Sequence, residues 1–158
     1  MSVTHPRGFL AAGAAIGLKS TGAKDLALVV NQGPEFSSAS VFTSNRCKAN
    51  PVLWSEQVVR DGIVHAVVLN SGGANCYTGP EGFQTTHQVA EKVANLIGTG
   101  AGNVVVCSTG LIGLSNPRHL LLDGVDAVHA RLDGDGGADA AEAIMTTDSV
   151  NKQIVVEG

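Results

Sequence analysis

The chain has 158 residues and a mass of 16.1 kDa, with 44% hydrophobic and 15% charged residues. That length and balance fit one folded domain over residues 1–158 and exclude a disordered chain. Ten basic and fourteen acidic residues give a net charge of −4 without a basic cluster, which argues against nucleic acid or an anionic membrane as a partner.

The cysteines and the first residues indicate the compartment. Cys47, Cys76 and Cys107 are an odd number and lack the CxxC spacing of many zinc sites. The five histidines are scattered, without metal-ligand spacing. No secretory signal and no apolar run of about 18 residues is present. We therefore expect a cytoplasmic protein with free thiols, no metal and no membrane segment.

The first half of the chain alternates short apolar runs with turn residues. Runs of small and β-branched residues predict strands, because such side chains suit a pleated, packed surface. After the break at Asn50-Pro51, a weak apolar pattern predicts a helix over 52–59. The strands expected here are 8–16, 26–30, 40–43 and 64–70.

Helices and strands alternate in the second half. Thr78 and Glu81 have capping-box spacing, and Pro117 suits the first turn after an asparagine cap. Two further strands are expected over 103–109 and 153–157. The expected helices run from Thr78 to Gly98, from Asn116-Pro117 to near Gly134, and over 138–145. Strands with amphipathic helices between them predict an α/β domain built in layers.

Loops of small residues carry the groups that suit substrate binding. Three valines form a buried strand that runs directly into Cys107-Ser108-Thr109-Gly110, where outward backbone N–H groups could stabilise a developing oxyanion. An ordinary strand-to-helix connection is the alternative interpretation. Similar loops lie at 70–75 and 146–148, and such loops suit a carbonyl or carboxylate. Phosphate is not expected, because neither a GxxxxGK[ST] nor a GxGxxG pattern is present.

Three other side chains are weaker candidates for chemistry. Cys76 and Cys107 could each act as a thiolate nucleophile with a distant histidine, although free cysteine is also among the most buried residue types. Asp148 could be a general acid or base, although a carboxylate that closes a turn is the more common outcome.

Six stretches of the chain together resemble the ornithine acetyltransferase family of arginine biosynthesis, also called glutamate N-acetyltransferases. In order from Gly8 onward, they are GFLAAGAAIGLKSTGAKDLALVVNQGP, VFTSNRCKANPVLW, VVLNSGGAN, TGPEGFQTTHQVAEKVA, CSTGLIG and AIMTTDSVNKQ. The combination is highly specific, although CSTGLIG alone is not.

The resemblance implies a fold and a reaction. The fold is a layered αββα sandwich similar to that of other self-cleaving, N-terminal-nucleophile enzymes. The precursor cuts itself into an α and a β chain, and the new N-terminal threonine of β carries the acetyl group from N-acetylornithine to glutamate. The resemblance implies no bound cofactor and an α2β2 heterotetramer.

The resemblance also assigns roles to particular residues. Thr109 and Gly110 match the oxyanion-hole pair, and Thr146, the first threonine of TTD, matches a substrate-binding residue. No residue here matches the nucleophile, since the chain stops before the family's KGxGM segment and cleavage threonine. The sequence departs from the family in ANCYTGP, where ANACTGP is expected, and in the LSNPR run over 114–118.

These features leave three hypotheses. The leading one is the α-chain part of an ornithine acetyltransferase that is inactive without its β-chain partner. A second is a non-catalytic homologue that acts as a binding or scaffold protein through an exposed sheet surface. A third is a cysteine-dependent acyltransferase or hydrolase that uses Cys107 or Cys76.

Overall fold

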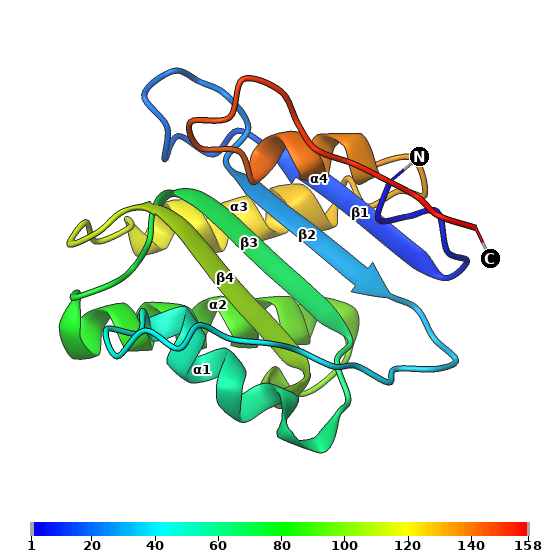
Figure 1. Ribbon diagram of the computed structural model, residues 1–158, viewed down its shortest axis with the longest axis horizontal. Helices are drawn as coiled ribbons and strands as arrows, with labels where there is room; N and C mark the ends of the chain where they lie inside the picture. The colour runs from blue at the N-terminus through cyan, green and yellow to red at the C-terminus, as the bar shows by residue number, and fades with distance from the viewer. Residues whose placement is uncertain (1, 158) are drawn as a thin grey trace.

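The computed structural model describes residues 2–157, which form a four-stranded sheet with helices on both faces (Figure 1). The strands are β1 (Phe9–Ala14), β2 (Leu26–Asn31), β3 (Ala66–Gly73) and β4 (Val104–Leu111), and they lie in this order in the sheet. β2 pairs antiparallel with both β1 and β3, whereas β3 and β4 are parallel. The parallel pair therefore directs two carboxyl ends to the same edge of the sheet.

Two of the helices, α2 (Gly79–Ile97) and α3 (Arg118–His129), cover one face of the sheet and build the main core. The other helices of the described residues are α1 (Asn50–Val58) and α4 (Gly137–Ala143), with single 3-10 turns at Val59–Asp61 and Ala101–Asn103. Val93 of α2 and Val125 of α3 are fully buried in one cluster with Leu28 and Val104 of the sheet. We call this side the α2/α3 face. Its apolar stripes confirm the amphipathic helices expected from the sequence.

The opposite side of the sheet, the α4 face, is covered less completely. Ala140 and Ala143 of α4 pack against Ala11 and Ala27, whose small side chains let the helix lie close to β1 and β2. Beyond α4 the face is open, and half-buried apolar side chains such as Leu69 line a hollow of about 510 Å³ there.

α1 covers part of the outer edge of β4. The indole N–H of Trp54 donates to the Val104 carbonyl at 3.0 Å. The Ser55 hydroxyl donates to the Val106 carbonyl at 2.8 Å and accepts the Val106 N–H at 3.1 Å. These side chains satisfy edge groups that a neighbouring strand would otherwise bind.

Two predicted strands are wrong. Residues 40–43 form no ladder, and Val41 is 98% exposed on a segment that crosses the surface. Residues 153–157 are likewise unpaired, with Ile154 86% and Val156 84% exposed. β-branched residues favour a strand only where a partner and a packing surface exist, and neither segment has a partner strand within residues 2–157.

Of the two predicted helix starts, one is confirmed and one is wrong. Thr78 is the N-cap residue of α2, but its hydroxyl donates to Asn75 Oδ1 at 2.5 Å and makes no capping hydrogen bond. Asn116 does not cap α3, because its side chain donates to the Gly73 carbonyl at 3.0 Å. α3 therefore begins at Arg118, and it ends at His129 rather than near Gly134. The predicted α/β layers and the other elements are confirmed with shifted ends, while residues 2–157 form one sheet rather than the two of the expected sandwich.

Candidate functional site

The carboxyl ends of β3 and β4 form the candidate site, and here the strands continue where the sequence predicted turns. Thr109 and Gly110 are both exposed and pair with Ser71 and Gly72 in the parallel ladder. Gly110 has φ +122°, and a Cβ there would lie 2.6 Å from the Gly72 carbonyl carbon. Only glycine fits this position, which explains how the two strands remain paired through their last residues.

The N–H and C=O groups of successive residues along β4 point alternately to its two sides, and those of Gly110 point to the outer edge of the sheet. Both polar backbone groups of Val106 bind Ser55 on that outer edge, whereas the Leu111 carbonyl accepts the Ala74 N–H on the inner side. Because alternate residues of a strand direct their N–H and C=O groups to the same side, the groups of Gly110 face outward beyond α1. The arrangement offers a donor at an accessible edge.

Thr109 pairs with Ser71 in the ladder, so its side chain lies on the same face of the sheet as that of Ser71, the α4 face. Ser71, its register partner, donates its hydroxyl to the Ala143 carbonyl at 2.5 Å, which fixes α4 to the same end of the sheet. Thr146 follows three residues later and is exposed. The turn that carries it lies at the same end of the molecule as the ends of β3 and β4 (Figure 1). The structure therefore brings all three predicted site residues to one end of the sheet.

Asp148 closes the turn that carries Thr146. Its carboxylate accepts the Thr146 N–H at 3.3 Å and pairs with Lys152. The hydrogen bond from Lys152, followed by the one from the Thr146 amide, lowers the pKa of Asp148. An ionised carboxylate at neutral pH is a poor proton donor, so the geometry favours the turn-closing role over the general-acid role.

The cysteines lack the environment of catalytic thiolates. Burial raises the pKa of the Cys107 thiol. Cys76 is buried and its Sγ lies 3.9 Å from the Cys47 carbonyl oxygen. A catalytic thiolate must be accessible and easily ionised, so the burial of Cys76 and the raised pKa of Cys107 favour a packing role for each.

Sequence reasoning missed Asp25 and the loop over 15–25, which support the candidate site from behind its exposed residues. The loop over 15–25 reaches the same end of the sheet, where Leu18 lies against Gly72. Asp25, fully buried, binds three backbone N–H groups of that loop. The signal that could have found it is an aspartate directly before a buried apolar strand, where a charge is costly unless it is fully hydrogen-bonded.

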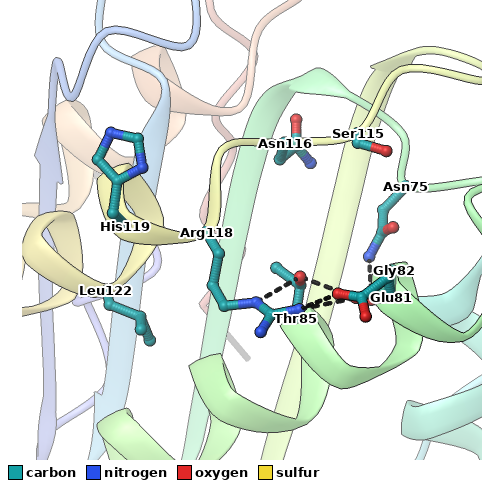
Figure 2. A pocket seen from close by; sticks show the side chains of 9 residues that line it. All are labelled: Asn75, Glu81, Gly82, Thr85, Ser115, Asn116, Arg118, His119 and Leu122. Carbon is teal, nitrogen blue, oxygen red and sulfur yellow. Dashed lines mark hydrogen bonds and ion pairs between the residues drawn. The ribbon is translucent and has the colours of Figure 1, made fainter.

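A separate cavity of about 500 Å³ lies between the amino ends of α2 and α3 (Figure 2). Arg118, from the LSNPR departure, reaches across it to Glu81 at 2.8 Å and Thr85 at 3.0 Å. Asn75 and Asn116 line it as well, but Thr109, Gly110 and Thr146 are not among its lining residues. Within residues 2–157, no three His, Cys, Asp or Glu side chains gather as a metal site, and no helix is both long and apolar enough to cross a bilayer.

Solved structures share this fold. An ornithine acetyltransferase from Mycobacterium tuberculosis, solved with ornithine, matches with a TM-score of 0.93 and 54% identity over 94% of this chain and 81% of that chain. The arginine biosynthesis bifunctional protein ArgJ from Bacillus halodurans matches with a TM-score of 0.87 and 32% identity over 95% of this chain and 78% of that one. These likenesses define the class as an α/β fold of the ornithine acetyltransferase type, as the sequence predicted.

Sequence comparison gives the family. The ArgJ family profile matches residues 10–158, and the chain belongs to that family. Proteins named arginine biosynthesis bifunctional protein ArgJ are 62% identical in Streptomyces coelicolor and 60% identical in Streptomyces avermitilis, each over 99% of this chain. The chain spans 41% of the length of these two relatives.

Proposed function

We propose that residues 1–158 are one domain that serves as most of the α chain of a glutamate N-acetyltransferase. The enzyme moves an acetyl group from N-acetylornithine to glutamate through an acetyl-threonine on a separate β chain. The observation that carries the proposal is the exposed end of β4, where Gly110 faces an open edge beside Thr109. Membership of the ArgJ family supports the choice of reaction.

The proposed chemistry divides between two chains. The threonine hydroxyl of the β chain attacks the acetyl carbonyl of N-acetylornithine, and its proton passes to the neighbouring α-amine and then to the leaving ornithine nitrogen. The Thr109 hydroxyl and the Gly110 N–H donate hydrogen bonds to the oxyanion that forms. One such donor contributes on the order of 3 kcal/mol to the transition state. The amine of glutamate then attacks the acetyl ester carbonyl, the bond to the threonine oxygen breaks, and the proton lost by the amine passes through the α-amine to that oxygen, which restores the hydroxyl.

Other parts of the chain complete the substrate site in this proposal. Thr146 contacts the substrate from the turn after α4, and the hydrogen bond between Ser71 and Ala143 supports this role because it holds the end of α4 on β3. The chain needs no cofactor of its own, and it works in the cytoplasm within an α2β2 assembly.

Reconstitution tests the proposal. The chain is produced together with the C-terminal region of the Streptomyces coelicolor relative, and acetyl transfer from N-acetylornithine to glutamate is measured. We expect transfer by the pair and none by either part alone. Thr109→Val should lower kcat by about 100-fold or more, because a donor aimed at the oxyanion is lost.

Thr99→Val is the matched control, since Thr99 lies in the turn before β4 at the other end of that strand. It should leave kcat unchanged. Full transfer by the isolated chain, or a Thr109→Val pair as active as the wild type, would contradict the proposal. A stable pair without any transfer would favour the non-catalytic binding protein instead.

A further inference from the structure

Asp25 is a fully buried carboxylate at the start of β2 with an unusual set of partners. It accepts the backbone N–H of Ile16 at 2.7 Å, of Leu18 at 2.7 Å and of Lys19 at 2.9 Å. An uncompensated buried charge is costly, whereas charge-assisted hydrogen bonds to several amides hold a backbone in one geometry. Asp25 therefore fixes the loop between β1 and β2.

The loop that Asp25 fixes lies against the carboxyl end of β3, which belongs to the candidate site. A Cβ on Gly72 would lie 3.0 Å from Leu18 Cβ, so the Leu18 side chain packs against the backbone of β3 at this position. Gly72 in turn lies against Gly110, where a Cβ would be 2.6 Å from the Gly72 carbonyl carbon. The main-chain carbonyl of Asp25 also accepts the Ser71 N–H at 2.8 Å.

These contacts connect the buried Asp25 carboxylate to the backbone of Gly110 through closely packed atoms. Leu18 and Gly110 both lie close to Gly72, and both glycines have positive φ values, of +133° and +122°. A shift of the loop would move Gly72 and, with it, the direction of the Gly110 N–H. Displacement of a catalytic group by about 1 Å can cost 100-fold in rate.

We propose that Asp25 is a positioning residue for acyl transfer, which sets the Gly110 N–H through Leu18 and Gly72. This inference rests on the function proposed above. Asp25 does not touch the substrate in this account, so its loss should weaken transition-state stabilisation and leave substrate binding nearly intact.

The test uses the reconstituted pair of chains. Asp25→Asn keeps the shape but replaces one acceptor oxygen with an NH₂ group, and Leu18→Gly removes the Cβ that lies nearest Gly72 while keeping the carboxylate. We expect each variant to lower kcat by about 10-fold with KM for both substrates within about twofold. The double variant should lose little more than either single one, because both act through the same contact.

Asp61→Asn is the matched control, since Asp61 also accepts a backbone N–H, from Ile63 at 3.0 Å, but in an exposed turn before β3. It should leave kcat unchanged. Unchanged kcat per folded enzyme in both Asp25→Asn and Leu18→Gly, whether or not they unfold at lower temperature, would overturn the inference while leaving the proposed function in place. A wild-type pair without acetyl transfer would overturn both.

Discussion

Gly110 occupies a position where a residue with a Cβ atom does not fit. Its φ of +122° is strained for other residues, and a Cβ there would lie too close to the Gly72 backbone for either strand to accept it without moving. The same contact brings two strand ends together and leaves an amide at the edge. Packing and the proposed chemistry therefore depend on the same absent side chain.

Gly110→Ala should lower the free energy of unfolding by about 2 kcal/mol or more, because backbone strain and a clash with backbone atoms add together. Gly113→Ala is the comparison, since Gly113 has φ +82° but nothing within 4 Å of its Cβ position. It should cost only the conformational strain, about 1 kcal/mol. Chemical denaturation of both variants measures the difference, and equal losses would show that the contact with Gly72 is not limiting.

At the level of single residues, local pattern predicted the exposed positions of the site but not their support. Thr109 and Gly110 follow a buried valine run, so small residues at a strand end were visible in the sequence. Asp25 was not, because its three partners lie six to nine positions earlier and bind through backbone N–H groups. Backbone hydrogen bonds across a loop leave no spacing that side-chain motifs reveal.

The strands differ in how well sequence predicts them. β3 and β4 were expected because valine runs are buried on both faces of a sheet. Residues 40–43 and 153–157 have similar composition, yet they remain unpaired within the described chain. The composition of a segment indicates whether its backbone tends to be extended. Whether it joins a sheet depends on an adjacent strand, and the residues of the segment itself do not show whether one is present.

α4 is a seven-residue helix whose position depends on contacts outside itself. Lys24 pairs with Asp139 and Glu142, both at 2.8 Å, and ties the helix to the loop between β1 and β2. These two hydrogen bonds, to Asp139 and then Glu142, raise the pKa of Lys24. A short helix has little stability of its own, so these contacts and the alanine packing hold it.

Lys24→Met should lower the free energy of unfolding by about 0.5–1 kcal/mol, since both ion pairs are partly exposed. Because the folded pKa is raised, the difference from wild type should be complete below the ordinary pKa of 10.5 and vanish as the pH rises through the folded value. Lys92→Met, which breaks the pair with Asp126 between α2 and α3, is the control. Hydrogen exchange should speed up in α4 only in the first variant, and equal protection of α4 in both would contradict the account.

The whole chain exposes more surface than its mass predicts. Its accessible area is 8567 Å², whereas a monomeric protein of 16.1 kDa is expected to expose about 7,400 Å². One apolar part of that surface lies on the α4 face, where Ile144 and Ile154 are 43% and 86% exposed and line a hollow together with half-buried strand residues such as Leu69. Apolar surface of this kind favours association.

We therefore expect the isolated chain to self-associate in sedimentation velocity experiments. Ile154→Asp should reduce that association without lowering the unfolding temperature, because the side chain is 86% exposed and its replacement removes no buried contact. Val41→Asp is the control, since Val41 is 98% exposed in the segment between β2 and α1. A monomeric wild-type chain, or equal effects of the two substitutions, would be inconsistent with association through the α4 face.

Trp54 is the only tryptophan of the sequence, and its indole donates to β4 while its ring packs near Phe83 and His87. All intrinsic tryptophan emission of this chain therefore originates at the outer edge of the last strand. The wavelength and quenching of this emission report on the outer edge of β4 without an added label. The indole binds Val104 at the start of β4, and Thr109 and Gly110 lie near the end of the same strand. Excitation at the red end of the absorption band would follow the docking of another polypeptide there in real time.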